Sequence, residues 1–270
     1  MSFWQNLLRL LDTDMEIPGL YGWFHILSLV VTIASAVLMP LRYRHESRET
    51  TRKMVLTVAV IVTLLEVYKQ INYSFGYEDG ISFRYQWYAF PFQFCSTPMY
   101  VGLVAGLTRK GKIHEAANAY LASYAVFAGI CVMLYPASVF IDTIGINVQT
   151  MVCHGSMIAV GVCLLAAGYV KPNLRSFRMA AAVFGVCVAL AAIMNEIAYR
   201  IGIPEGHDFN MFFISPHSAP SLPVYSLIQQ VVPFPFCLMI YVAVFSLAAF
   251  LILLAARGLA SVKRSKTAVS

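Results

Sequence analysis

Charged residues are scarce in this sequence. Asp, Glu, Lys and Arg make up 12% of its 270 residues, whereas 59% are hydrophobic and the mean hydropathy is +0.71. A soluble globular domain usually carries about 25% charged residues. This scarcity excludes an ordinary soluble domain and predicts an all-α polytopic membrane protein. The net charge of +6 reflects basic loops between the spans, so we expect no nucleic-acid partner.

The sequence also lacks the features that mark three other kinds of membrane protein: transporters, zinc enzymes and retinal proteins. The sequence has no inverted repeat and no paired broken helices, which argues against a transporter. It has no H-x-x-x-H or H-x-x-E pair, which argues against a zinc site. Residues 224–256 contain no Lys, which excludes a retinal protein with its Schiff-base lysine in the last span.

Long hydrophobic segments dominate what is present. A membrane-spanning helix needs roughly 20 mostly apolar residues. Seven segments meet this need, at about 22–41, 54–75, 91–108, 116–139, 148–170, 179–200 and 224–256. The last is long and contains Pro233 and Pro235, so we expect an interfacial segment or a kink there.

Basic residues follow every second span. Fifteen of the 19 Lys and Arg residues lie after spans one, three, five and seven, which predicts an outer N-terminus and a cytoplasmic C-terminus. We therefore expect one domain over residues 1–270, in a cell membrane of the bacterial plasma-membrane type. It has an outer N-terminal segment (1–20), an outer loop that can act as a lid (201–222) and a cytoplasmic tail (257–270).

A few polar residues interrupt the apolar spans. Such residues are costly at membrane depth and mark a functional site by default. They come from five spans, and the predicted topology places all of them in the outer half of the bilayer: His25, Glu66, Lys69, Gln93, Cys95, His154, Asn195 and Glu196.

Cys95 lies in the most distinctive short segment, residues 90–98. Pro91 suits the first position of a helix, and Pro98 predicts a bend beside Cys95. A cysteine near a helix N-terminus is favoured as the reactive thiolate. The alternative is a small apolar core cysteine.

His154 precedes Gly155 and Ser156, which allow close helix approach. It can act as a general acid or base, or it can be a histidine hydrogen-bonded between helices. Glu66 and Lys69 can form a structural ion pair, or Glu66 can orient His154. The same two interpretations, structural or functional, apply to Asn195 and Glu196.

The order and spacing of these residues resemble the YwaF family of bacterial integral membrane proteins, which is related to the animal acyltransferase transmembrane protein 164. The resemblance covers nearly the whole chain. It rests on His25, the Pro91–Cys95 segment, His154-Gly155, Asn195, the segment from Asn210 to Pro216, and Pro233.

The resemblance implies a lipid acyltransferase in which Cys95 and His154 are catalytic and a thioester forms on the enzyme. We expect membrane lipids as acyl donor and acceptor, and no cofactor or metal. The residues expected to support catalysis or bind substrate are His25, Glu66, Lys69, Gln93, Asn195, Glu196 and Asn210.

Two alternatives remain open. One is a metal-dependent membrane lipid hydrolase, whose outer-side ligands are histidines together with Glu66 or Glu196. The candidate histidines are His25, His154, His207 and His217. The other is a non-enzymatic transporter or lipid-handling protein with Glu66 and Lys69 in its path.

Overall fold

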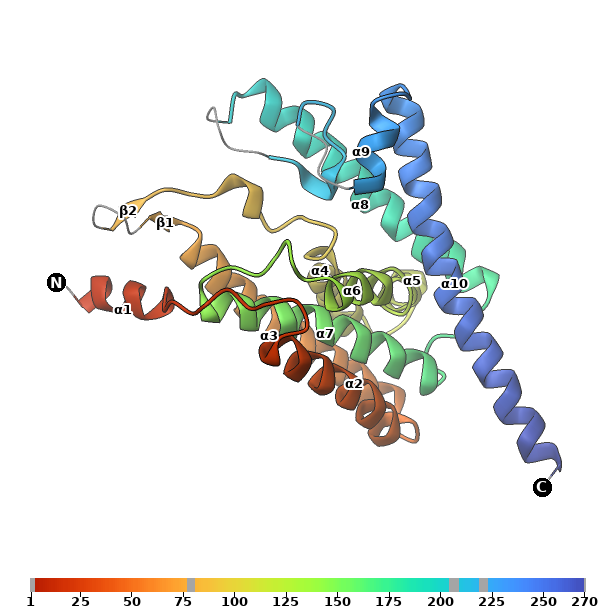
Figure 1. Cartoon of the computed structure of the whole chain (residues 1–270). Helices are drawn as coiled ribbons and strands as arrows, with labels where there is room; N and C mark the ends of the chain where they lie inside the picture. The colour runs from red at the N-terminus through yellow and green to blue at the C-terminus, as the bar shows by residue number, and fades with distance from the viewer. Residues whose placement is uncertain (1–2, 77–80, 204–208, 219–222, 270) are drawn as a thin grey trace.

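The computed structural model describes residues 3–76, 81–203, 209–218 and 223–269 and is almost entirely helical (Figure 1). The described part contains α1 (Phe3–Leu11), α2 (Trp23–Tyr43), α3 (Arg48–Asn72), β1 (Phe75–Gly76), β2 (Ser82–Phe83), η1 (Trp87–Ala89), α4 (Thr97–Leu107), α5 (Lys112–Leu121), α6 (Tyr124–Leu134), α7 (Ile144–Ala166), α8 (Leu174–Arg200), η2 (Met211–Phe213), α9 (Pro223–Gln229) and α10 (Phe234–Val269). The strands β1 and β2 form a short antiparallel ribbon.

Six helices of the described chain are long and apolar enough to cross a membrane. They are α2, α3, the consecutive pair α5 and α6, α7, α8 and α10. The predicted all-α multi-pass membrane fold is confirmed. The seventh predicted span contains only the shorter apolar helix α4, so the count of seven stays a prediction.

The α5–α6 pair and α7 form the centre of the molecule. In the most apolar 18-residue stretch of each span, 72% of the α5–α6 pair and 67% of α7 are buried. In the other four spans the buried share is 17–28%. Helix α7 packs against α2, α3 and α6, while α5 packs between α4 and α8. The outer helices thus expose most of their apolar surface, as lipid-facing helices do.

Small residues set the spacing around α7. A Cβ on Gly129 of α6 would lie 2.7 Å from the His154 carbonyl oxygen, and one on Gly155 would collide with Thr32 of α2. The predicted close helix approach beside His154 is therefore confirmed, and it fixes α7 against both neighbours.

The third predicted span differs from expectation. Helix α4 begins at Thr97 rather than at Pro91, and residues 90–96 are non-helical. Pro98 lies in the first turn of α4, where its missing N–H would have had no intrahelical partner. The prediction of a helix starting at Pro91 and bent at Pro98 was therefore wrong, because Pro98 suits the first turn itself.

The predicted break near Pro233 is confirmed. Helix α9 ends at Gln229 and α10 begins at Phe234, directly after Pro233. In Figure 1, the β1–β2 ribbon and α1 lie to the left, and the α7–α8 connection and the C-terminus lie to the right. The basic loops thus gather at one end of the bundle, while the membrane orientation stays a prediction.

Candidate functional site

Two non-helical segments face each other inside the bundle. Residues 90–96 lead into α4, and residues 209–215 surround η2. Their aromatic rings pack together, with Phe90 against Phe209 and Phe94 against Phe212. Irregular backbone at membrane depth is tolerated only where protein buries it or where it lines a cavity. This pairing is therefore a packed, ordered part of the fold rather than an exposed loop.

Gln93 joins the two segments. Its Nε2 donates to the Asn210 carbonyl at 3.0 Å, and its Oε1 accepts from the Phe212 backbone N–H at 3.0 Å. The Gln93 side-chain amide thus bonds as a backbone peptide group would, and it joins two segments of the chain that are not paired as β-strands. Phe212 and Phe213 adopt positive φ angles of 59° and 57°, a conformation that such bonds must hold in place.

Asn195 of α8 holds the same segment from the other side. Its Nδ2 donates to the Met211 carbonyl at 3.0 Å, and its Oδ1 accepts from the Met211 N–H at 2.7 Å. Asn210 accepts from the Ser215 N–H through Oδ1. Asn195, Asn210 and Gln93, three of the predicted site residues, form an amide clamp on residues 210–215, so the Gln93 and Asn195 amides are already engaged with protein backbone.

A buried charged cluster lies on α3. Lys69 Nζ lies 2.8 Å from Glu66 Oε1, so the predicted ion pair is present. Glu66 also accepts from Gln70 at 2.9 Å and from Gln149 of α7 at 3.3 Å. Buried ion pairs persist when additional hydrogen bonds compensate for their lost hydration, and Glu66 has two such bonds.

Tyr85 orients Gln70 within this cluster. Its hydroxyl donates to Gln70 Oε1 at 2.6 Å, and Gln70 Nε2 donates to Glu66 and to the Ala89 carbonyl. Burial, and then the charge of Glu66, raise the pKa of Tyr85 to about 12. The hydroxyl therefore stays protonated and remains a donor across the neutral pH range.

His154 is buried and has one free nitrogen. Its Nδ1 lies 2.7 Å from the Thr150 carbonyl oxygen. Because a carbonyl only accepts, Nδ1 carries the proton, and Nε2 of the neutral imidazole holds a lone pair. Nε2 is buried and has no hydrogen-bond partner within the described chain. A buried basic nitrogen without a partner is suited to accept a proton from a bound group.

Cys95 belongs to the same neighbourhood. Met99, one turn after Cys95 in the chain, shares a buried cluster with Cys153, the residue that precedes His154. The backbone N–H groups of Phe94 and Cys95 form no hydrogen bond to another residue of the described chain. Cys95 precedes the α4 N-cap, Ser96, so the positive end of the helix dipole is close to the thiol.

A groove of about 460 Å³ opens beside this cluster, between α3, the β1–β2 ribbon and α4. Glu66 and Gln70 line its polar part, while Val67, Ile71 and Tyr100 line its apolar part. The latter three side chains are more than one third exposed on the lipid-facing surface. The groove therefore connects the surrounding membrane sideways with the Glu66–Lys69 pair.

One comparison with known proteins gives a match. A model of the TMEM164 family matches residues 20–254. The chain belongs to the TMEM164 family. The predicted relation to transmembrane protein 164 is thereby confirmed. No curated protein and no solved structure matches the chain.

In this TMEM164-family chain, His25 differs from His154. Its Nδ1 accepts from the Tyr21 N–H at 3.0 Å, and its Nε2 donates to the Met133 carbonyl at 2.9 Å. The ring is fully buried and stacks on Tyr21. His25 thus connects the start of α2 to the end of α6, and both of its nitrogens are engaged.

Glu196 lies away from the charged cluster, on an exposed face of α8. It pairs with Arg200 at 2.6 Å and with His217 at 2.9 Å. His207, the other histidine considered as a metal ligand, lies outside the described residues. Within the described residues no group of three His, Cys, Asp or Glu side chains can hold a metal ion.

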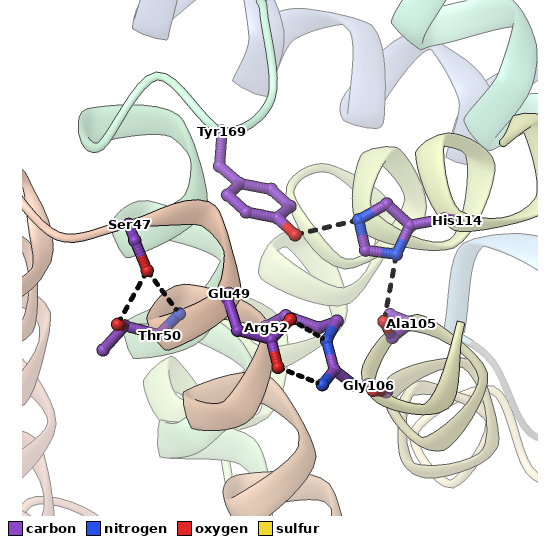
Figure 2. Close-up of polar contacts among 8 residues, drawn as sticks. All are labelled: Ser47, Glu49, Thr50, Arg52, Ala105, Gly106, His114 and Tyr169. Carbon is purple, nitrogen blue, oxygen red and sulfur yellow. Dashed lines mark hydrogen bonds and ion pairs between the residues drawn. The ribbon is translucent and has the colours of Figure 1, made fainter. Parts of the chain in front are cut away.

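A second buried polar cluster lies at the opposite end of α4 (Figure 2). Arg52 donates to the Gly106 carbonyl and pairs with Glu49. His114 contacts the Ala105 carbonyl through Nδ1 at 3.1 Å and the Tyr169 hydroxyl through Nε2 at 2.8 Å. Arg52 and His114 thus satisfy the last carbonyls of α4, so this cluster closes the end of the short helix.

Gln149 and Cys153 are members of the candidate site that the sequence analysis missed. Gln149 Nε2 contacts both Glu66 and the Cys153 sulfur. Their spacing of four places them on one face of α7, next to His154 in the chain. That i, i+4 polar pair within an apolar span was a usable signal.

Proposed function

We propose that this chain is a membrane-embedded lipid acyltransferase, a transacylase, that uses Cys95 as the nucleophile and His154 as the general base. The observation that supports it most is the unpartnered, buried Nε2 of His154. The preceding residue, Cys153, lies in one buried cluster with Met99 of α4, one turn after Cys95. The family resemblance implies the same two residues, Cys95 and His154.

The lateral groove suits a lipid substrate. Pockets for drug-sized ligands usually measure about 300–1,000 Å³ and are mostly apolar with a few polar groups. The groove of about 460 Å³ has Glu66 and Gln70 at its polar part and opens between apolar side chains. A phospholipid diffusing in the bilayer can enter sideways, with its ester group held at the polar part.

The first half-reaction transfers the acyl group to the enzyme. His154 Nε2 accepts the Cys95 thiol proton, and the thiolate sulfur attacks the ester carbonyl carbon. The tetrahedral intermediate collapses with cleavage of the C–O ester bond. The alkoxide of the departing lysolipid takes the proton from His154, which leaves a Cys95 thioester and a neutral imidazole.

The second half-reaction reverses these roles. His154 Nε2 accepts a proton from an acceptor hydroxyl, whose oxygen attacks the thioester carbonyl. The C–S bond breaks, and the Cys95 thiolate recovers the proton from His154. The N–H groups of Phe94 and Cys95, which bind no other residue of the described chain, are the best candidates to stabilise both oxyanions. The Gln93 and Asn195 amides already bind backbone groups.

Intact-protein mass spectrometry after incubation in native lipid tests this proposal. Wild type is expected to carry a fatty-acyl mass adduct that hydroxylamine removes, and Cys95→Ala is expected to carry none. Cys131→Ala is the matched control, because Cys131 is an exposed thiol of α6 away from the site; it should retain the adduct.

Two results would contradict the proposal. One is an adduct of the same mass on Cys95→Ala. The other is the absence of any adduct on wild type together with unchanged lipid turnover in Cys95→Ala. Analysis of the released product separates a transacylase from a lipase, since water as acceptor yields free fatty acid through the same residues.

A further inference from the structure

A second groove, of about 520 Å³, lies between α5 and α8. It is formed where both helices begin, α5 at Lys112 and α8 at Leu174. The groove is therefore at the C-terminal end of α4, opposite to Cys95, and the chemistry proposed above makes no use of it.

Cations and small apolar residues alternate along this groove in a regular way. Lys112, Arg175 and Arg178 line it, and each is followed one turn later by an apolar lining residue, Ala116, Met179 and Ala182 respectively. Residues four apart share a helix face. The positively charged residues thus lie at the start of the two helices, and the apolar lining residues of the groove lie one turn further toward the middle of the spans.

The described residues neutralise only part of the positive charge of the groove. Arg175 pairs with Glu115 at 2.6 Å, while Lys112 and Arg178 form no ion pair with the described residues. Glu115 is the single acidic residue in the first turn of α5, and the first turn of α8 has none. Both helix N-termini add positive dipole ends to the three cations.

We propose that this groove binds an anionic phospholipid. The phosphate lies between Lys112 and Arg178, and an acyl chain lies over Ala116 and Ala182. The groove opens at the end of the bundle that carries the basic loops, where lipid phosphates occur, and basic pockets between membrane helices favour anionic headgroups. The proposal concerns a binding site and does not depend on the Cys95 chemistry.

Native mass spectrometry of the delipidated full chain, titrated with phosphatidylglycerol or phosphatidylcholine, tests the site. Lys112→Gln/Arg178→Gln is expected to lower the affinity for phosphatidylglycerol by about 25-fold, roughly fivefold for each cation. The control Arg44→Gln/Lys53→Gln removes two exposed cations from the same end outside the groove, and it should leave that affinity within about twofold, since neither cation lines the groove.

A second variant separates a lipid from a free anion. Ala182→Phe fills the apolar part of the groove without changing any charge, so it should also weaken phosphatidylglycerol binding, and inorganic phosphate should compete poorly. Equal losses in the groove and control variants would overturn the proposal, as would full competition by inorganic phosphate. A dimer mass that the groove variants abolish would assign the surface to a second copy of the chain. Retention of phosphatidylglycerol by Cys95→Ala would show that the two sites are independent.

Discussion

Three buried histidines of this chain differ in how many of their ring nitrogens are engaged in hydrogen bonds. His25 and His114 each use both ring nitrogens in contacts with backbone carbonyls, a backbone N–H or a tyrosine hydroxyl. His154 uses only Nδ1. Saturated histidines stabilise helix contacts, whereas a histidine with a free lone pair can transfer protons. At the residue scale this difference separates structural from catalytic candidates.

Separate substitutions of His154 and His25 test the distinction between a catalytic and a structural histidine. His154→Gln should lower acyl transfer by about 10²- to 10⁴-fold, the usual contribution of a general base, with a melting temperature close to wild type. His25→Leu should instead destabilise the fold by about 1–3 kcal/mol for each of two groups, because it leaves the Tyr21 N–H and the Met133 carbonyl unpaired. Lipid turnover and thermal unfolding in detergent are measured for both. An unchanged rate in His154→Gln would contradict the assignment.

The Glu66–Lys69 pair allows a second prediction at this scale. Glu66→Gln leaves Lys69 as an uncompensated buried charge, which should cost about 3–5 kcal/mol of unfolding free energy. Lys69→Met should destabilise comparably, and the double variant should be more stable than the sum of the two single losses indicates. Chemical denaturation of all four proteins gives the coupling energy. Strict additivity would show that the two side chains do not interact.

At the element scale, the short helix α4 explains the location of the candidate site. Its 11 residues span roughly 16 Å, about half of a hydrocarbon core of roughly 30 Å. The non-helical residues 90–96 directly precede Thr97, and they bring Cys95 to the N-terminus of α4. The apolar composition of residues 91–108 predicted a span, but it could not show where the helix starts, because Pro91 and Pro98 both suit a first helical turn.

The clamp on residues 210–215 was equally hidden from the sequence. Gln93 and Asn195 were recognised as polar residues at membrane depth, and that prediction rested on the cost of burial alone. Their partners are backbone groups of a segment more than a hundred residues from Gln93. Side-chain to backbone contacts of this range leave no periodic signal.

Asn195→Ala should open the clamp. The buried Met211 N–H and carbonyl would lose their partners at a cost of about 1–3 kcal/mol for each group, and the positive φ angles of Phe212 and Phe213 would lose support. Faster amide hydrogen exchange at residues 211–213 is the expected result. Asn173→Ala removes the capping side chain at the other end of α8, so it should leave exchange at 211–213 unchanged. Equal protection in Asn195→Ala and wild type would rule out the clamp.

At the scale of the whole molecule, composition and periodicity predicted the multi-pass helical fold because membrane spans are defined by length and hydropathy. Composition and periodicity did not predict which helices pack against one another. The central position of the α5–α6 pair and α7 depends on which faces pack together, and nearly uniform apolar segments do not show this. Buried and lipid-facing positions have the same hydrophobic side chains, so only polar residues such as Glu66 and His154 indicated the interior.

The number of membrane crossings decides on which side the candidate site lies. If α4 and residues 90–96 together cross the bilayer, the β1–β2 ribbon and the loop after α4 lie on opposite sides. Residues 90–96 are partly folded into turns, with the Ser96 and Thr97 N–H groups bonded to the Gln93 carbonyl. They therefore add less to the roughly 16 Å of α4 than the about 3.3 Å per residue of an extended chain. Basic residues in the loop after α4 then place that loop in the cytoplasm and Cys95 in the outer half.

Two exposed positions of the full chain report this topology. Ser82 lies in strand β2, and Lys110 lies between α4 and α5. In intact cells a membrane-impermeant maleimide should label Ser82→Cys, and it should label Lys110→Cys only after permeabilisation, with wild type as the background. Labelling of both positions in intact cells, or of neither, would mean that α4 does not complete a crossing. The chain would then have six spans, and its two termini would lie on the same side of the membrane.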